Sequence, residues 1–337
     1  MKKLFILCPY VTTGGPQTLH QLVDKLNNLK LLDAYIVYSN KSTSVLEQYK
    51  NYNIKVANTI EDDEDNILIV PETMTHYLKK YKKIKKIIWW LSLDFFKETT
   101  FEVRYNRLIK TKKIPKLILP LFRLIYSIFS NSTKMYKFDD NNKYFHLYNC
   151  EYIRLYLEEK GIKEENMSYL CGPIREEYLH PKKIQRNDFI VYNPKKGIEY
   201  TEKIINYFKS KNSPIKFIKL ENMTYHQIIE ILNKSKVYID FGFFPGPERV
   251  PREAVSMGCC IITGLVGSSV NDIDVPIPKK YKFDREELDL ELIYNSINEL
   301  INNYDNHYNE FGEYRKKVKG QIDNFENNIK TIFETIL

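Results

Sequence analysis

Residues 236–263, KVYIDFGFFPGPERVPREAVSMGCCIIT, constrain the fold more than any other part of the chain. Val237–Phe241 is a short apolar run of the kind that forms a strand covered on both faces, and Cys259–Thr263 is a second. Between them, glycines and prolines predict a loop, and Pro251 suits the first turn of a short helix from about Arg252 to Met257. Because ligands of open α/β sheets bind beyond the carboxyl ends of strands, the charged side chains of this loop become site candidates. They are Glu248, Arg249, Arg252 and Glu253.

The segment PREAVSMGCCIIT resembles the nucleotide-sugar motif in the C-terminal domain of GT-B glycosyltransferases. In that motif an acidic residue opens a helix, a small residue and a glycine close it, and an apolar strand follows. The resemblance implies that Glu253 holds the ribose hydroxyls of the donor. Many retaining members have a second glutamate eight positions upstream, where this chain has Pro245. Glu248 is an alternative for that role, and the stereochemistry of the reaction stays open.

The length and the alternation of elements predict two domains. A chain of 337 residues exceeds the usual size of one domain, and expected strands alternate with expected helices along most of it. We expect an α/β protein with two Rossmann-like domains that face each other across a cleft, the GT-B arrangement. The boundaries expected are an acceptor-side domain over 1–180, a nucleotide-sugar domain over 181–315, and a C-terminal helix over 316–337 that packs back on the first domain.

Basic residues of the second domain are candidates for the donor diphosphate. Lys195 and Lys196 lie in NPKKG, between the first strand and first helix of this domain. Such a loop presents ammonium and helix N–H groups to phosphate, although a solvated turn is an alternative. Arg249 and Arg252 are stronger candidates, because a guanidinium offers a rigid bidentate fork.

The first domain contains further candidates. Gly14 and Gly15 lie in TTGGP, which we expect to be a loop after the first strand; they allow a ligand to approach the backbone, but a plain tight turn explains them equally well. Asp94 and Glu72 each follow an expected strand, so both are predicted near its carboxyl end. An inverting enzyme needs a base for the acceptor's proton, with Asp94 the first candidate and Glu72 the second. Helix capping is the alternative for both. His20 and His76 are weaker candidates.

No metal and no cofactor is expected. Asp272-Ile273-Asp274 spells the D-x-D motif of metal-dependent GT-A transferases, but it lies late in the chain before a proline-rich turn. The cysteines show no metal-ligand spacing and no paired framework, which predicts a reducing, cytoplasmic compartment.

Positive charge is concentrated in the first domain. Residues 77–86 hold six lysines, and residues 103–138 hold nine lysines and arginines without an acidic residue. The apolar run 114–130 within this stretch suggests that residues 104–137 lie on an anionic membrane, as a comparable patch does in several GT-B transferases. A buried helix flanked by solvated lysines is the alternative. Nucleic acid is not an expected partner, because no recognition motif is visible.

These patterns together predict a glycosyltransferase that moves a sugar, with retention favoured, from a nucleoside-diphosphate sugar to a saccharide or lipid-linked acceptor. It would be cytoplasmic or peripheral on the inner face of the membrane. Two alternatives remain at this point: a nucleotide-sugar epimerase-like enzyme, and a non-catalytic module that binds glycans or membranes.

Overall fold

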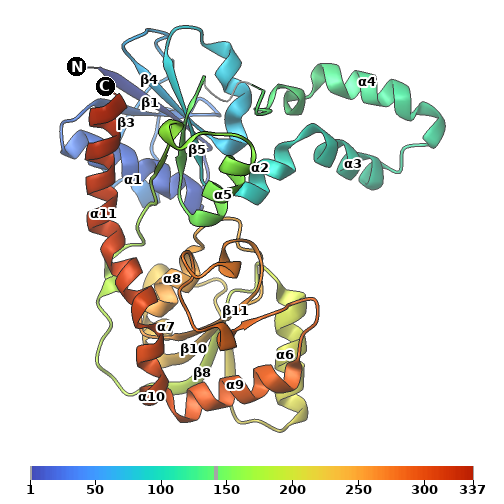
Figure 1. The fold of residues 1–337 in the computed structure, drawn as a ribbon, viewed down its shortest axis with the longest axis vertical. Coiled ribbons are helices and arrows are strands. Elements are labelled where there is room, and N and C mark those ends of the chain that lie inside the picture. Colours follow the sequence, from blue (N-terminus) through green and yellow to red (C-terminus); the bar gives the residue numbers. More distant parts are fainter. Residues whose placement is uncertain (1, 140–142, 337) are drawn as a thin grey trace. The chain divides into compact units, whose positions relative to one another are not determined.

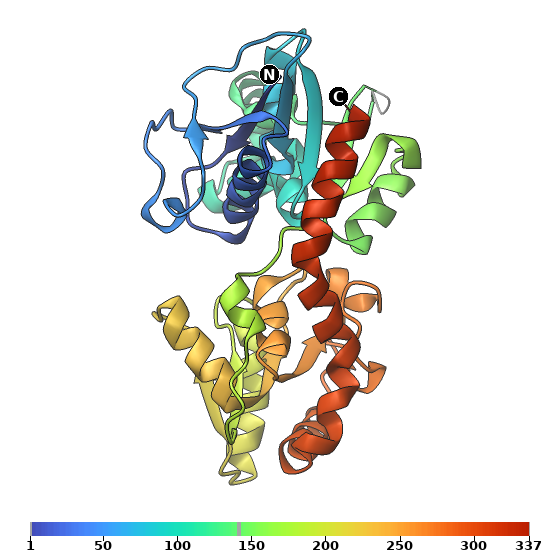
Figure 2. The same ribbon diagram turned by 90° about the vertical axis from the view of Figure 1, so that its left-hand side faces the viewer.

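The computed structural model describes residues 2–139 and 143–336. The chain divides into two compact units, one formed by Met1–Gly172 with Phe325–Leu337 and the other by Pro173–Asn324. Each unit contains one sheet with helices packed on its faces (Figure 1 and Figure 2). All strand pairs in both sheets are parallel. The expected α/β class with two Rossmann-like domains is confirmed.

The first sheet has seven strands in the order β3-β2-β1-β4-β5-β6-β7. Its central strands are runs of Ile, Leu, Val and Trp that are buried along most of their length, as expected for strands covered by helices on both sides. Since the order reverses between β1 and β4, the switch point of this sheet lies at their carboxyl ends. The strands are β1 (Lys3–Cys8), β2 (Asp33–Tyr38), β3 (Lys55–Val56), β4 (Ile67–Pro71), β5 (Lys85–Trp90), β6 (Phe145–Tyr148) and β7 (Met167–Tyr169).

Helices cover this sheet through apolar faces. Helix α1 (Gly14–Asn28) buries Leu19, Leu22, Val23 and Leu26, as its periodicity predicts. It begins at Gly14, within the TTGGP segment expected to be a loop, because first-turn N–H groups need no helical partner and so tolerate Gly-Gly-Pro. The end of α11 (Gly312–Ile336) contributes Phe325, Ile329, Ile332 and Phe333 to the same core. The other helices are α2 (Leu93–Thr99), α3 (Phe101–Lys112), α4 (Leu119–Phe129) and α5 (Glu151–Glu159).

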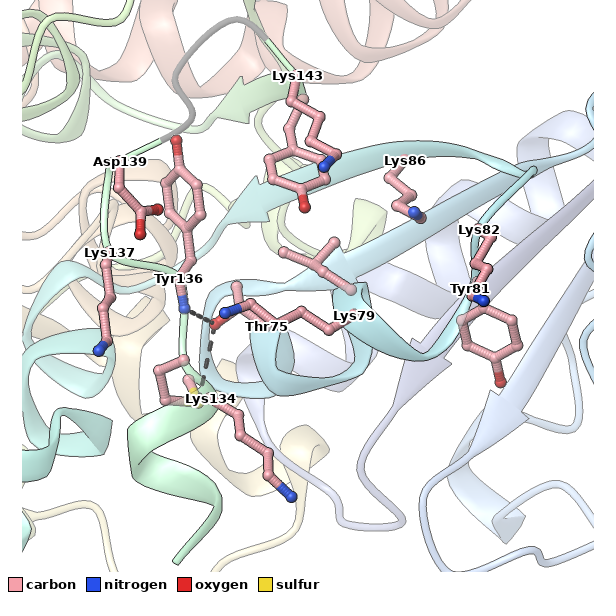
Figure 3. Close-up of a pocket in the computed structure, with 13 residues that line it drawn as sticks. Thr75, Lys79, Tyr81, Lys82, Lys86, Lys134, Tyr136, Lys137, Asp139 and Lys143 are labelled. Carbon is pink, nitrogen blue, oxygen red and sulfur yellow. Dashed lines mark hydrogen bonds between the residues drawn. The ribbon is translucent and has the colours of Figure 1, made fainter. Parts of the chain in front are cut away.

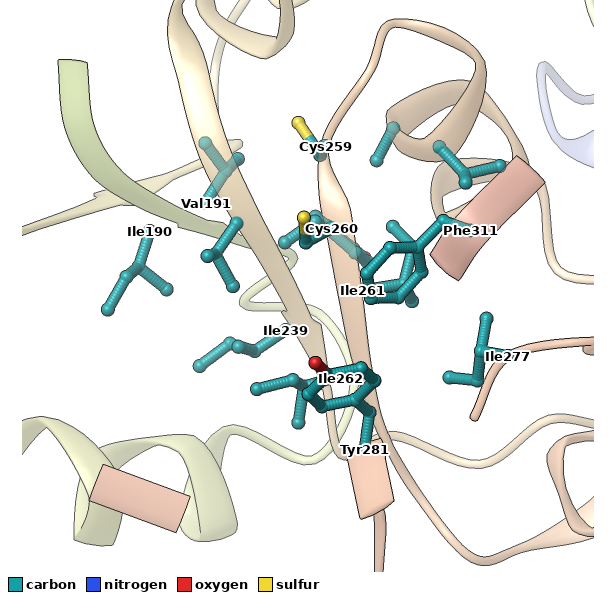
Figure 4. Packing of buried hydrophobic residues seen from close by; sticks show 14 of the residues in the cluster. Ile190, Val191, Ile239, Cys259, Cys260, Ile261, Ile262, Ile277, Tyr281 and Phe311 are labelled. Carbon is teal, nitrogen blue, oxygen red and sulfur yellow. The ribbon is translucent and has the colours of Figure 1, made fainter. Parts of the chain in front are cut away.

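The second sheet has five strands in the order β12-β11-β10-β8-β9. Its core is formed by Ile, Val and Cys side chains of β8, β10 and β11 together with aromatic side chains of neighbouring segments (Figure 4). The order reverses between β8 and β10, so the switch point of this sheet lies where these two strands end. The strands are β8 (Asn187–Tyr192), β9 (Lys216–Lys219), β10 (Ser235–Asp240), β11 (Cys260–Gly264) and β12 (Lys282–Phe283).

The helix between β10 and β11 starts earlier than its sequence suggests. Helix α8 (Arg249–Ser256) begins three residues before Arg252, and Pro251 lies in its first turn, where the missing N–H is not needed. Gly258 follows the helix with φ of 94°, a left-handed conformation suited to glycine. The other helices are α6 (Ile198–Ser210), α7 (Tyr225–Lys234), α9 (Leu290–Asn302) and α10 (Tyr304–Tyr308).

Helices α3 and α4 form a hairpin that projects from the rest of the first unit (Figure 1). Rings of Phe101, Tyr105, Phe122 and Tyr126 stack between them at centroid distances of 5.5 to 6.3 Å. None of the described side chains of α4 is buried. Among the described residues, no helix is both long enough and apolar enough to cross a membrane.

Candidate functional site

The charged residues singled out in the second unit lie at the switch point of its sheet. Residues 193–197 follow β8 and residues 241–248 follow β10, and these two strands are hydrogen-bonded neighbours. Their carboxyl ends therefore meet at one edge, and the two loops leave that edge together. This is the position where ligands of open parallel sheets bind.

Two glycines allow these loops to touch. Gly197 has φ of 61°, and a Cβ atom there would lie 2.4 Å from the carbonyl oxygen of Phe241. A Cβ atom on Gly242 would lie 2.6 Å from Cβ of Lys196. Any larger residue at either position would push the backbones apart. The close approach fixes where Lys196 emerges relative to the loop that leads to α8.

Two cation–carboxylate pairs lie at this edge, one between the two loops and one within α8. Nζ of Lys196 lies 2.6 Å from Oε2 of Glu248, and these side chains are 20% and 18% exposed. Nε of Arg249 lies 3.7 Å from Oε1 of Glu253, one helical turn further along α8. Four of the predicted donor-binding residues thus form two partly exposed ion pairs at this edge. Lys195 is exposed in the same loop, and its backbone N–H donates to Oδ1 of Asn193.

Arg252 lies beneath these pairs and is 5% exposed. Its Nη2 donates to the carbonyl of Pro247 at 3.0 Å and its Nε to the carbonyl of Glu248 at 3.2 Å. Its Nη1 donates to Oε1 of Gln321 in α11 at 2.8 Å. The guanidinium therefore binds the end of the 241–248 loop to α8 and to α11 within the second unit.

Burial raises the pKa of two acidic groups of this site. Burial raises the pKa of Glu253, and the positive charges of Arg249, Arg252 and Arg175 oppose that rise. Asp240, at the end of β10, has its pKa raised to about 6, first by burial and then by the negative charge of Glu248. Its carboxylate accepts hydrogen bonds from the hydroxyl of Tyr238 and the N–H of Gly242, both at 2.9 Å.

Sequence reasoning did not select Asp240. The available signal was an acid that ends an otherwise apolar strand directly before the Gly/Pro loop. In the structure this carboxylate fixes the first turn of the loop through the N–H of Gly242.

The segment after β11 supports the same loop and offers little to a ligand. The Ser268 hydroxyl donates to the carbonyl of Gly246 at 2.7 Å, and Ser269 donates to Val266 at 2.8 Å. Asp272 pairs with Lys282 at 2.8 Å. Among the described residues, no group of three or more His, Cys, Asp or Glu side chains is placed to hold a metal ion.

The candidates of the first unit lie at the carboxyl edge of its own sheet. Glu72 follows β4 and is 3% exposed; its Oε2 accepts the N–H of Leu91 at 2.9 Å. Burial raises the pKa of Glu72 to about 7. Asp94 is half-buried in the first turn of α2, where Ser92 rather than Asp94 is the N-cap. Gly14 and Gly15 belong to the first turn of α1, not to the preceding loop.

The two histidines differ in their surroundings. Nδ1 of His20 contacts the carbonyl of Pro16 at 2.6 Å and Nε2 contacts the hydroxyl of Tyr38 at 2.8 Å. Burial lowers the pKa of His20 to about 4, so it is a neutral, structural residue. His76 is half-buried, and its pKa is lowered by burial and then by Lys80, Arg104 and Lys134.

No family model matches the chain, and no curated protein matches it in sequence. Among solved structures, sucrose-phosphate synthase of Thermosynechococcus elongatus aligns with 100% of this chain and 99% of its own length, at a TM-score of 0.65 and 10% identity. Anabaena HepE in complex with UDP-glucose aligns with 99% of this chain and 100% of its own length, at a TM-score of 0.63 and 9% identity.

A mutant of S. aureus TarM, solved with UDP, aligns with 80% of this chain at a TM-score of 0.52 and 15% identity. The chain spans only 56% of the length of that TarM chain. Because the sequence identities are this low, the structural similarity establishes the fold alone. The chain has the GT-B fold of these glycosyltransferases, as its sequence predicted.

Proposed function

We propose that this protein is a glycosyltransferase that moves a sugar from a nucleoside-diphosphate sugar to a saccharide or lipid-linked acceptor. The proposal rests on two ion pairs at the switch point of the second sheet, Lys196–Glu248 and Arg249–Glu253. The fold supports it, since HepE, which is solved with UDP-glucose, and TarM, solved with UDP, share it.

Each charged residue takes a separate role in this proposal. Lys195, Lys196 and Arg249 meet the diphosphate, whose negative charge grows as the bond to the sugar breaks. Glu253 accepts hydrogen bonds from the ribose hydroxyls of the donor. Arg252, whose N–H groups already bind two backbone carbonyls and Gln321, positions the loop that carries Glu248. The cations replace a metal ion, so EDTA leaves turnover unchanged.

We favour retention of configuration. A retaining reaction needs no separate base, because the departing phosphate oxygen takes the acceptor's proton. The surroundings of Glu72 support this choice, because Glu72 is buried and accepts a backbone N–H. Asp94 remains the candidate base for an inverting reaction. The anomeric configuration of the product, read by NMR, decides between the two.

Calorimetric titration with UDP, GDP and dTDP tests the donor site. We expect one of them to bind, and we expect Arg249→Ala to weaken it at least tenfold, because a guanidinium bound to phosphate is lost. Lys211→Ala, which removes an exposed cation of the same unit paired with Glu291 at 3.1 Å, is the matched control and leaves binding unchanged. Binding of none of the three nucleotides contradicts the proposal and favours a non-catalytic module. Donor epimerisation without transfer identifies the epimerase-like alternative.

The hairpin supports a membrane location for the acceptor. Its exposed side chains include Leu121 at 61%, Ile128 at 62% and Phe129 at 83% exposure, next to a run of basic residues. We infer that the hairpin, within residues 104–137, lies on the inner face of an anionic membrane, with apolar side chains at the acyl boundary and lysines at the headgroups.

Vesicle flotation tests this location. We expect the protein to bind vesicles of phosphatidylcholine with phosphatidylglycerol, and to bind more weakly as the salt concentration rises. Leu121→Ser with Ile128→Ser should reduce the bound fraction without changing UDP affinity. The matched control, Leu292→Ser, changes a side chain that is 53% exposed in the second unit. Equal binding by the hairpin variant and the control contradicts the membrane location and leaves the transferase proposal intact.

A further inference from the structure

The first unit contains a basic pocket that the proposed reaction does not use. It has a volume of about 590 Å³ and is formed by three segments that lie apart in the sequence (Figure 3). One is the helical turn after β4, another leads into β5, and the third provides lining residues within 134–139 and at positions 143 and 144, directly before β6. Among its described lining residues are one acid, Asp139, and the lysines Lys79, Lys82, Lys86, Lys134, Lys137 and Lys143.

Buried side chains line the pocket together with these lysines. Thr75, Met135, Tyr136 and Tyr144 line it and are between 1% and 8% exposed. Oγ1 of Thr75 accepts the N–H of Tyr136 at 3.1 Å and lies 3.8 Å from the sulfur of Met135, which joins two of the three segments (Figure 3). The lysines therefore surround a packed hollow and are not spread over a convex surface.

Five of the pocket lysines differ in their contacts from paired lysines elsewhere in the molecule. Among the described residues, no carboxylate forms an ion pair with Lys79, Lys82, Lys86, Lys134 or Lys137. Lys196 and Lys282, by contrast, each pair with an acid within 2.8 Å. A concave group of like charges focuses a positive potential and attracts anions of high charge.

Lys86 shows the consequence for one side chain. It is half-buried at the start of β5, and its pKa is lowered by burial and then by the neighbouring charge of Lys143, while the negative charge of Asp62 opposes this shift. An anion in the pocket would favour the charged form of this amine.

The position of the pocket separates it from the predicted catalytic edge. Lys86 is the second residue of β5, and Tyr144 directly precedes β6, so the pocket lies toward the amino ends of these strands. Glu72, Asp94 and the glycines of α1 follow or lie beyond carboxyl ends. In a parallel sheet these are opposite edges.

We propose that this pocket binds a phosphate- or diphosphate-bearing ligand at a site separate from that of the sugar donor. Lysine ammonium groups act as point charges that several phosphate oxygens can share, and a multiply charged anion matches several cations better than a single carboxylate does. The volume is in the range of small-molecule sites. A lipid headgroup and a soluble phosphorylated compound are both sources of such a group.

Calorimetric titration with inorganic pyrophosphate tests the site. The donor site also attracts diphosphate, so the titration is made in the Arg249→Ala background, where nucleotide binding is weakened. We expect Lys86→Gln with Lys134→Gln to weaken the remaining pyrophosphate binding at least tenfold. Lys182→Gln with Lys183→Gln, which changes the net charge equally at exposed positions in the second unit, should leave it unchanged. Thermal melting confirms that both variants fold.

Further measurements separate the site, the ligand chemistry and its source. Pyrophosphate should slow acetylation of Lys86 and Lys134 in mass spectra, whereas succinate at the same concentration should not. Because the hairpin is itself expected to bind anionic vesicles, binding of phosphatidic acid vesicles is compared in the Leu121→Ser, Ile128→Ser background. A further loss on adding Lys86→Gln with Lys134→Gln assigns the phosphate to a lipid headgroup, and unchanged binding assigns it to a soluble compound. Equal pyrophosphate affinity in the pocket variant and its control overturns the proposal, as does equal protection by succinate. UDP binding to protein that keeps Arg249 tests the donor site separately, so its outcome does not depend on the pyrophosphate result.

Discussion

The two units contain positive charge in different forms. At the switch point of the second sheet, Lys196 lies next to the partly exposed carboxylate of Glu248, and Arg249 lies next to the buried carboxylate of Glu253. In the first unit, a pocket is lined by lysines of which five form no ion pair with a described acid, and a hairpin exposes apolar side chains. The paired cations have fixed positions before a ligand arrives, which suits a reaction that needs precise placement. The pocket lysines supply charge with less constraint, which suits attraction of an anion or a surface.

The largest effect that we expect is on sugar transfer, and it separates two buried glutamates, Glu253 of the second unit and Glu72 of the first. Glu253→Gln should lower sugar transfer about 100-fold, because an amide replaces the carboxylate that accepts the ribose hydrogen bonds and neutralises Arg249. Glu72→Gln is the matched control, since Glu72 is equally buried but lies in the first unit. The measurement is kcat/KM for the donor. A similar loss of kcat/KM in both variants would contradict the placement of the donor site in the second unit.

A smaller effect is expected on stability at Arg252. Arg252→Lys keeps the charge but cannot reach Pro247, Glu248 and Gln321 together, since one ammonium replaces three N–H groups that point in different directions. We expect the free energy of unfolding to fall by about 3 kcal/mol, measured by urea denaturation. Arg285→Lys, at a surface pair with Glu286, should change it by less than about 0.5 kcal/mol. A loss at Arg252 no larger than that of the control contradicts the positioning role.

The buried carboxyl group of Glu72 should also make the free energy of unfolding depend on pH. Folding raises its pKa from 4.5 to about 7, so between these values the native state binds more protons than the unfolded chain. This residue therefore makes the free energy of unfolding fall as the pH rises from about 4.5 to about 7. Glu72→Gln should remove roughly 2 kcal/mol of that decline. Denaturation at pH 5 and pH 8 measures this decline, and an unchanged difference between the two pH values contradicts the raised pKa of Glu72.

The smallest effect is expected for the ion pairs themselves. Lys196→Met should change stability by about 1 kcal/mol, because its partner Glu248 is only 18% exposed and loses its compensating charge. Lys211→Met removes an ammonium from a pair whose side chains are 41% and 56% exposed, and should change stability by less than about 0.5 kcal/mol. Equal effects in thermal melting would mean that the site pair is no more constrained than a surface pair.

Much of the architecture was predictable from local patterns. Buried apolar runs such as Ile67–Pro71 and Cys260–Gly264 are marked in the sequence by composition, and the helices between them by periodicity. Alternation of the two then restricts the sheets to parallel ones with helices on both faces. The helix starts were displaced, as at Arg249 and Gly14, because first-turn residues escape the steric demands that mark a helix interior.

The amino-acid sequence alone determined the α/β class, the two sheets and the loop that holds the charged residues between β10 and β11, because each depends on neighbours along the chain. Only the tertiary structure decided that Arg252 binds backbone carbonyls and Gln321, that Lys196 rather than Lys195 meets Glu248, and that Asp240 is buried. It also brought the pocket lysines together from three segments. Such choices depend on contacts between residues far apart in sequence, where burial and geometry select the partner.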